Sequence, residues 1–248
     1  MRPTVFVAGS HPALNLVRQW LIRHGALLTS HIEEATHRII GGYSQQLVVH
    51  ANIPTLVLST SDVYWSPDEK PCFSEDDILA IPSTRDISVL PAIECITSEA
   101  LAFRHSSKTL VLRTFNVYGP SVYGGFVSAF VAQAKLQEAL SIPLPGYQER
   151  TFLFEEDFLA FFGYFWEKFS AGLSGIYNVG SPVSLSLNRA ADVVWQRTNH
   201  TKEPAPVTQE SLPFSLQWKV VPDMTRTHAE IPYKAATTLS AGIWKMNQ

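Results

Sequence analysis

The stretch LVLRTFNVYGP, residues 110–120, decides the fold of this chain. It begins with Leu110, Val111 and Leu112, an apolar run that predicts a short buried strand. It ends in Gly119 and Pro120, which stop the strand and predict a loop. In an open α/β sheet, ligands bind outside the carboxyl ends of the strands, where this loop would emerge. We therefore expect residues 115–120 to lie at a ligand-binding edge of a parallel sheet.

The segment RTFNVYGP resembles the extended short-chain dehydrogenase/reductase family, which includes nucleotide-sugar epimerases and dehydratases. The order and spacing of the family's segments hold from about residue 36 to 245, and weakly over residues 4–25. The resemblance implies an α/β fold with a Rossmann-like parallel sheet and a small C-terminal substrate lobe. We expect residues 1–140 to form a core that is truncated after its first βα unit. Residues 141–248 would form a mixed substrate-binding lobe interleaved with that core.

Composition narrows the possible partners. The 248 residues carry a formal net charge of −3, so they offer no basic field for nucleic acid. No apolar run is long enough to span a bilayer, and the first residues lead into a strand rather than a signal peptide. The two cysteines form no disulfide framework, which favours a reducing cytoplasm. Neither they nor the eight scattered histidines show metal-ligand spacing, so the sequence predicts no metal site.

The N-terminal residues resemble a dinucleotide-binding unit with an altered loop. A β-rich run from Thr4 to Ala8 ends at Gly9, and a helix is expected to follow. The fingerprint of such units has three glycines, and the family's spacing places Gly9, Pro12 and Asn15 there. Pro12 removes a backbone donor, and Asn15 puts a side chain where the helix should press on the sheet. The segment is either a plain strand–turn–helix or a distorted cofactor loop, so the NAD(P) that the resemblance implies has a degenerate site.

The next segment is short for its expected task. The fingerprint requires an acid about 20 residues later, after a second strand, to bind the adenosine ribose. Residues 26–38 hold one short strand at most, at residues 26–30, before a helix predicted over residues 39–51. The strands that lie under the adenosine half of the cofactor in relatives are missing. Glu33 and Glu34 could imitate the ribose acid, but a place in the first turn of a helix suits them better.

Two segments resemble the family's catalytic set. The segment TSDVY follows a buried strand and places Thr60 at the position of the catalytic hydroxyl, with Asp62 as the one retained acid; alternatively, these groups only cap the backbone. The family's Tyr-x-x-x-Lys pair becomes Cys95 and Glu99. A Lys lowers the pKa of a phenol, whereas a carboxylate raises the pKa of a thiol. Cys95 is therefore expected to be a small buried residue and a poor base.

The C-terminal half supplies the substrate-side residues. Arg150 falls on the arginine that grips the diphosphate of the sugar nucleotide in relatives, and a surface salt bridge is the alternative. Asp157 matches an acid expected to cap the next helix, and Arg226 is a second candidate for phosphate. Phenylalanines at positions 158, 161, 162, 165 and 169 form a helical stripe that predicts core or an oligomer face. The acid cluster at residues 75–77 is expected to be a solvated face.

These observations favour an epimerase/dehydratase-like protein that binds a nucleotide sugar or a partner protein and has little or no redox activity. Thr60, Asn116 and Arg150 remain from the substrate side, whereas the cofactor loop and the proton-transfer pair do not. One alternative is an active NAD-dependent nucleotide-sugar epimerase or dehydratase in which Asp62 or Glu99 moves protons. Another is a regulatory or scaffold subunit that pairs with an intact relative through its helices. The sequence leaves both a homo-oligomer and a hetero-oligomer open.

Overall fold

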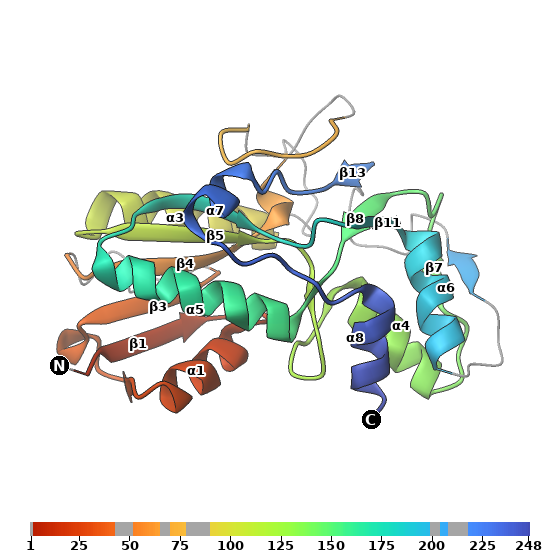
Figure 1. Cartoon of the computed structure of the whole chain (residues 1–248), viewed down its shortest axis with the longest axis horizontal. Helices are drawn as coiled ribbons and strands as arrows, with labels where there is room; N and C mark the ends of the chain where they lie inside the picture. Colours follow the sequence, from red (N-terminus) through yellow and green to blue (C-terminus); the bar gives the residue numbers. More distant parts are fainter. Residues whose placement is uncertain (1, 43–51, 65–69, 78–89, 199–203, 208–217) are drawn as a thin grey trace.

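The computed structural model describes residues 2–42, 52–64, 70–77, 90–198, 204–207 and 218–248 (Figure 1). Its centre is a sheet of six parallel strands in the order β10-β5-β4-β3-β1-β2. The strands are β1 (Thr4–Gly9), β2 (Leu27–Thr29), β3 (His37–Gly41), β4 (Thr55–Thr60), β5 (Thr109–Thr114) and β10 (Gly175–Val179). The predicted α/β class and the buried strand at the start of residues 110–120 are both confirmed.

The sheet reverses its winding direction at β1. The chain passes from β1 to β2 on one side and then to β3 on the other. A Rossmann sheet has the order 3-2-1-4-5-6, so one strand is missing outside β2. Residues 30–36 hold only a 3₁₀ turn, η1 (Ile32–Glu34), before β3 begins. The shortened sheet therefore results from the short connection between β2 and β3.

Helices cover both faces of the sheet. Helices α1 (Leu14–Arg23) and α5 (Glu155–Ala171) lie together on one face, and α3 (Leu90–His105) lies on the other (Figure 1). Alternate strand residues serve the two faces, so Leu56 and Leu110 belong to the cluster with α1 and α5, whereas Val57 and Val111 pack near α3. The predicted aromatic stripe of α5 is core, because all five of its phenylalanines are fully buried.

A second cluster of helices and short strands follows the carboxyl edge of the sheet. Helices α4 (Gly125–Lys135), α6 (Leu187–Arg197) and α8 (Leu239–Met246) share a separate hydrophobic core. The short strands that accompany them are β6 (Val117–Tyr118), β7 (Ser141–Pro143), β8 (Glu149–Thr151), β9 (Leu153–Phe154), β11 (Ser184–Ser186), β12 (Ala205–Val207) and β13 (Lys219–Val220). Helix α7 (Thr225–Glu230) instead packs against β10 of the main sheet. Strand β10 belongs to the main sheet and α5 packs on it, although both come after residue 140. The two regions therefore interleave. A domain boundary at residue 140 stays a prediction.

Three expectations about local structure are wrong. Residues 39–41, predicted to begin a helix over residues 39–51, are instead the end of β3, which pairs with β1 and β4 and stops at Gly41. The rest of that predicted helix, residues 43–51, lies outside the described residues. Asp157 does not cap α5 but accepts a hydrogen bond from Thr237 N at 2.9 Å and another from the Tyr233 hydroxyl. Glu75 is not solvated, since it is 6% exposed and accepts a hydrogen bond from Asn178 N.

Candidate functional site

The carboxyl ends of the parallel strands meet at one edge of the sheet. In the strand register, Gly9 at the end of β1 lies beside Gly41 at the end of β3, and Thr60 at the end of β4 lies beside Thr114 at the end of β5. The reversal of winding between β1 and β3 places the ligand crevice of an α/β sheet here. The structure thus brings the predicted cofactor loop, hydroxyl and Asn116 loop to the same edge.

The three residues of the predicted cofactor loop lie in the turn between β1 and α1. Gly9 has φ +115°, and a Cβ atom there would lie 1.8 Å from the carbonyl oxygen of Gly41. This glycine is required by the approach of β3. Pro12 is exposed, and so is Asn15, whose side chain accepts a hydrogen bond from Arg18 at 3.1 Å. Asn15 therefore points away from the sheet, contrary to expectation.

The side chain of His11, which sequence reasoning missed, crosses the sheet edge. Its Nε2 lies 3.1 Å from Oγ1 of Thr114, and its Nδ1 lies 3.2 Å from the backbone nitrogen of Ala13. The Thr114 hydroxyl donates to the carbonyl oxygen of Ser59 at 3.0 Å, so it must accept from His11. This assigns the neutral Nε2–H tautomer. Burial lowers the pKa of His11 to about 4, which agrees with a neutral ring.

The predicted hydroxyl and its acid lie after β4. The side chain of Thr60 accepts a hydrogen bond from Asp62 N at 3.2 Å and caps a 3₁₀ turn, η2 (Ser61–Val63). Thr60 therefore caps the backbone, as the alternative interpretation of this segment predicted. Asp62 is exposed by surface area, yet the loss of water around its carboxyl raises its pKa, while Thr60 and the charge of Arg150 act in the opposite direction.

Cys95 and Glu99 lie on α3, but Glu99 is held by another residue. Arg113 of β5 donates from its terminal NH2 to Glu99 Oε2 at 2.7 Å and from Nε to Oε1 at 3.1 Å. Ser59 donates to the same Oε1 at 2.6 Å. Both charged side chains are buried, so this is a bidentate ion pair inside the molecule. Burial, and then the charge of Glu99, raise the pKa of Cys95 to about 12, which keeps its thiol protonated at neutral pH.

The ion pair continues into a buried network. Arg113 also donates to the Tyr64 hydroxyl at 3.1 Å and to the carbonyl oxygen of Glu75 at 3.0 Å. Tyr64 in turn donates to Oδ1 of Asn178 at 2.6 Å, and burial raises its pKa to about 12. Each of these groups has a structural partner, so we assign the network to stability. The available sequence signal was an arginine inside an otherwise apolar strand.

Two of the predicted substrate-side residues keep polar groups without protein partners. Asn116 adopts a left-handed conformation with φ +44°, and its buried side-chain nitrogen has no hydrogen-bond partner among the described residues. Arg150 is 6% exposed and donates to the carbonyl oxygen of Glu149 at 2.8 Å. Within the described ranges Arg150 forms no ion pair, so it is not the surface salt bridge of the alternative. Burial lowers the pKa of Arg150 to about 10, and Asp62 opposes this shift.

Arg226 differs from Arg150. It forms ion pairs with Asp76 and, at 3.8 Å, with Glu75, and its side chain is 40% exposed. This candidate is therefore already paired with the acid cluster. The described residues contain no group of three or more histidines, cysteines or carboxylates placed to hold a metal ion, and none of their helices has the length and hydropathy of a membrane span.

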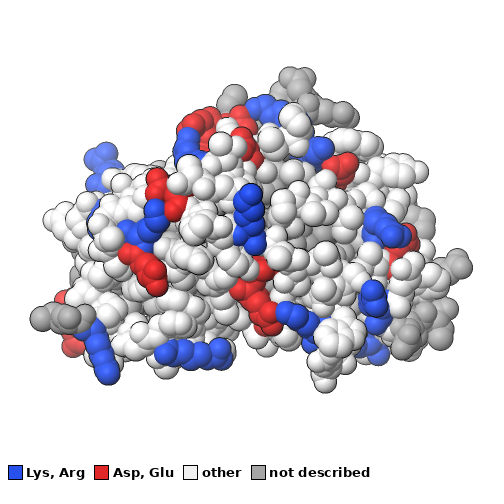
Figure 2. Space-filling model, in the orientation of Figure 1, with Lys and Arg blue, Asp and Glu red and all other residues white. Residues whose placement is uncertain are grey.

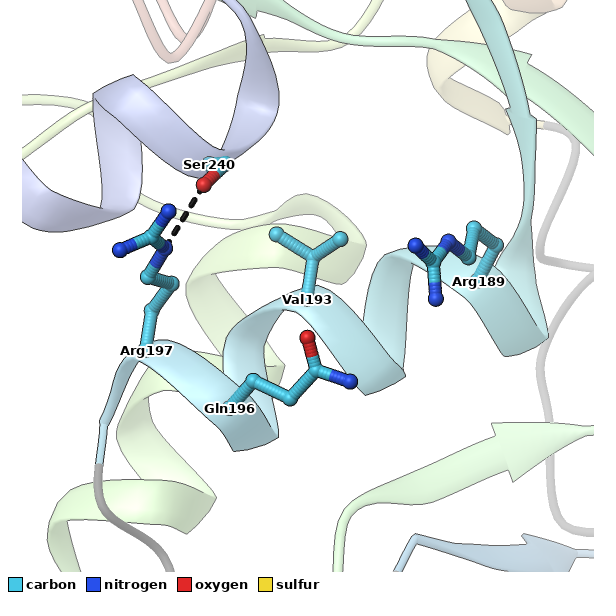
Figure 3. A pocket seen from close by; sticks show the side chains of 5 residues that line it. All are labelled: Arg189, Val193, Gln196, Arg197 and Ser240. Carbon is cyan, nitrogen blue, oxygen red and sulfur yellow. Dashed lines mark hydrogen bonds between the residues drawn. The ribbon is translucent and has the colours of Figure 1, made fainter.

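On the face of the molecule drawn in Figure 2, the charged side chains of the described residues form no patch of one sign. Figure 2 shows basic and acidic side chains interspersed over the described residues of one face. A separate pocket lies between α6 and α8, where Arg189, Val193 and Arg197 of α6 face Ser240 of α8 (Figure 3). Arg197 donates to the Ser240 hydroxyl at 2.7 Å. None of the predicted site residues lines this pocket.

Comparison with known proteins gives consistent results. Residues 34–180 match the model of the NAD dependent epimerase/dehydratase family. UDP-glucuronic acid decarboxylase 5 of Arabidopsis thaliana is 28% identical over 148 residues, which are 58% of this chain and 42% of that protein. The chain thus spans less than half the length of the curated relative it matches.

Two solved structures share the fold. UDP-glucose 4-epimerase of Thermotoga maritima, solved with UDP-glucose, has a TM-score of 0.74 and 16% identity, covering 98% of this chain and 96% of that one. dTDP-glucose 4,6-dehydratase of Bacillus anthracis, solved with NAD, has a TM-score of 0.76 and 15% identity, covering 99% and 95%.

Proposed function

The chain belongs to the NAD dependent epimerase/dehydratase family, and from this premise we propose that it binds a nucleotide sugar and carries out little or no hydride chemistry. The observation that carries the binding half is the environment of Arg150. A buried guanidinium normally pairs with an acid, because burying an uncompensated charge is costly. Here the described partners are a backbone carbonyl and the more distant charge of Asp62. A diphosphate would supply the missing negative charge and accept two parallel hydrogen bonds.

Asn116 supports the same ligand. Its free side-chain nitrogen lies at the carboxyl edge of the sheet, in the loop after β5. A buried donor without an acceptor destabilises a protein by about 1–3 kcal/mol, so such a group suits a site that a ligand completes. Hydroxyl groups of a sugar are suitable acceptors. In this proposal Arg150 binds the diphosphate and Asn116 binds the sugar, while Thr60 remains near the sugar at the end of β4.

The second half of the proposal concerns proton transfer. Removal of a proton from a sugar hydroxyl needs a base whose pKa lies near the working pH. Cys95, with a pKa of about 12, is a poor base at neutral pH, and Glu99 is engaged by Arg113 and Ser59. Neither can replace a phenol activated by a lysine. We therefore expect turnover of UDP-glucose or UDP-glucuronic acid to be negligible compared with that of intact relatives.

Calorimetric titration tests the binding half. UDP, UDP-glucose and UDP-glucuronic acid are titrated into the full chain and into Arg150→Ala. We expect the substitution to weaken binding of all three by about 1.5–3 kcal/mol, roughly 10- to 150-fold, because a charge-assisted contact to the diphosphate is lost. Arg189→Ala, which changes an exposed arginine on α6, is the matched control and should leave the affinity unchanged. Equal affinity of Arg150→Ala and the unmodified chain would refute the role of Arg150.

A second candidate function is that of a regulatory subunit. Leu90 and Phe103, near the two ends of α3, are 49% and 48% exposed, so this helix presents apolar side chains that a partner could cover. Such a helix could contact an intact relative. If the chain binds no UDP-sugar but forms a stable complex with an active epimerase or dehydratase, this candidate replaces the first.

A further inference from the structure

The amide groups of the turn between β1 and α1 already have acceptors inside the protein. Ser10 N donates to Gly41 O at 2.7 Å, and His11 N donates to the same oxygen at 3.3 Å. Pro12 has no N–H group. Ala13 N donates to Nδ1 of His11, and Leu14 N donates to the carbonyl oxygen of His11 at 3.0 Å. Every amide from residue 10 to residue 14 is therefore satisfied within the chain.

A dinucleotide needs the same groups. In a Rossmann unit the pyrophosphate sits at the N-terminus of the first helix, where free backbone N–H groups point at it and glycines let it approach. Here α1 begins after Ala13 without a side-chain cap. The close approach at Gly9 is made by Gly41 of the neighbouring strand, which leaves less than a normal contact distance for any added atom. The amides of the β1–α1 turn are therefore not free for a pyrophosphate. Of the amides from residue 10 to residue 16, only those of Asn15 and Leu16, in the first turn of α1, have no acceptor among the described residues. Without the free amides and glycines of the turn itself, the residues present are a poor fit to a pyrophosphate.

The side chain of His11 lies across the carboxyl edge of the sheet, where the crevice of an α/β sheet would open. Its ring reaches from the end of β1 to Thr114 at the end of β5 and receives an amide hydrogen bond from the turn behind it. Both ring nitrogens therefore have partners, and the pKa of about 4, caused by burial, keeps the ring uncharged at neutral pH. A neutral ring offers no positive charge to a phosphate.

The adenosine side is also altered. Strand β2 is the outermost strand on its side, and its Leu27 and Leu28 are 53% and 38% exposed. Glu34 accepts a hydrogen bond from Thr29 at 3.2 Å, and Glu33 pairs with His31 at 3.5 Å, so both acids lie in the η1 turn and bond locally. The predicted place of these acids in a helical turn is correct, and neither forms a hydrogen bond or ion pair with a described residue of the crevice.

From these observations we infer that His11 is an internal substitute for the dinucleotide, and that the chain binds its nucleotide sugar without NAD or NADP. The inference deepens the proposed function and rests on it only for the nucleotide sugar. His11 acts as a positioning residue: it ties the β1–α1 turn to β5 and closes the crevice in which the pyrophosphate of a cofactor would lie.

Nuclear magnetic resonance of the full chain with ¹⁵N-labelled histidine tests this assignment. We expect His11 to give the signals of the neutral Nε2–H tautomer at neutral pH, and these signals should not move when NAD, NADH or NADP is added. Calorimetry should give a dissociation constant weaker than about 1 mM for each dinucleotide. A saturable shift of the His11 signals, or a tighter dissociation constant, would overturn the inference.

A pair of valine variants links the signals to the bridge. Thr114→Val removes the acceptor for Nε2–H and should shift the His11 signals, whereas Thr109→Val, which removes a hydroxyl bonded to Ala102 on the same strand, should not. Unchanged His11 signals in Thr114→Val would show that the bridge is absent in solution. Circular dichroism on both variants confirms that they are folded.

A coupled titration separates this inference from the proposed function. Where the binding of two ligands is coupled, one typically changes the affinity for the other by about 5- to 150-fold. We expect about 1 mM NAD to change the dissociation constant of UDP-glucose by less than about twofold, because the dinucleotide does not bind. If no UDP-sugar binds and NAD does not bind either, the proposed function fails and the closure by His11 stands. If both bind and affect each other, the closure fails and the sugar-nucleotide site stands.

Discussion

Substitution of Glu99 by glutamine tests whether this position has become structural. Arg113 is 2% exposed and Glu99 is 4% exposed, so the neutral amide leaves a buried guanidinium without its counter-charge. Removing one partner of a buried pair costs about 3–5 kcal/mol. The total stability of a domain is about 5–15 kcal/mol, so the loss should be large and easily measured. It should exceed the loss of one hydrogen bond, because Glu99 accepts two bonds from Arg113 and one from Ser59.

Urea unfolding followed by circular dichroism provides the measurement. The midpoint should fall while the denaturant dependence stays constant, which identifies a change in stability alone. Glu94→Gln makes the same chemical change on the same helix at a half-buried position and should shift the free energy of unfolding by no more than about 0.5 kcal/mol. A cost below about 1 kcal/mol for Glu99→Gln, or equal costs for the two variants, would contradict the reasoning.

The same pair predicts that the family's lysine cannot simply be restored. Glu99→Lys would place an ammonium group against the Arg113 guanidinium, and two like charges about 4 Å apart repel by about 4 kcal/mol at an effective dielectric constant of about 20. Added to the lost ion pair, this cost is comparable to the stability of the whole domain. We expect the variant to be unfolded, with or without Cys95→Tyr. A folded, soluble Glu99→Lys protein would show that the Arg113 site tolerates positive charge.

Three further predictions concern the edge of the sheet and the C-terminal segment. The pKa of His11 falls from 6.5 to about 4 on folding, so the ring contributes stability that is present above pH 6.5 and is lost as the pH falls through about 4. The full shift corresponds to about 3 kcal/mol, and His11→Gln should remove that share of the pH dependence of urea unfolding. Gly9→Ala should cost at least about 3 kcal/mol, whereas Gly25→Ala, with φ +83° and no atom within 4 Å, should cost only about 1 kcal/mol; thermal unfolding of the two decides. Asp157→Asn should lower the free energy of unfolding by about 1–3 kcal/mol and speed hydrogen exchange at the Thr237 amide, because the Asp157 carboxylate accepts a hydrogen bond from that amide. Unchanged exchange at Thr237 would show that this hydrogen bond does not stabilise the segment.

The main strands could be predicted from sequence because buried parallel strands are short apolar runs bounded by turn residues. Residues 39–41 were predicted as helix but form a strand, because their apolar run is also short. Ile39 and Ile40 are too few to reveal a period, and a short apolar run is compatible with a helix or a strand. The following Gly41 and Gly42 were the signal for a strand end, since glycine pairs disfavour a first helical turn.

The roles of Arg113, Glu75 and His11 could not be predicted in the same way. Arg113 meets Glu99 on a different element, and Tyr64 meets Asn178 across 114 positions of sequence, so no local pattern contains either pair. Glu75 stands in an acid run that resembles a solvated loop, yet Asn178 and Arg226 hold it inside. His11 has no helical or strand period, and only the register of β1, β3 and β5 reveals that its ring spans the crevice.

Ser59 connects the two altered parts of the site. Its carbonyl oxygen accepts from Thr114, which binds His11, and its hydroxyl donates to Glu99, which pairs with Arg113. The proposed closure by His11 and the proposed loss of the proton-transfer pair therefore involve side chains that are joined through one residue of β4. If the amides of the β1–α1 turn became free, Arg113 would still pair with Glu99, the residue at the position of the family's lysine. If Glu99 became a lysine, His11 would still bind Thr114 at the edge of the sheet. Hydrogen-bond networks couple their members. Under the proposed function, a gain of hydride chemistry would therefore require simultaneous changes in the β1–α1 turn, α3 and β5, whereas the environment of Arg150 and Asn116 would need none.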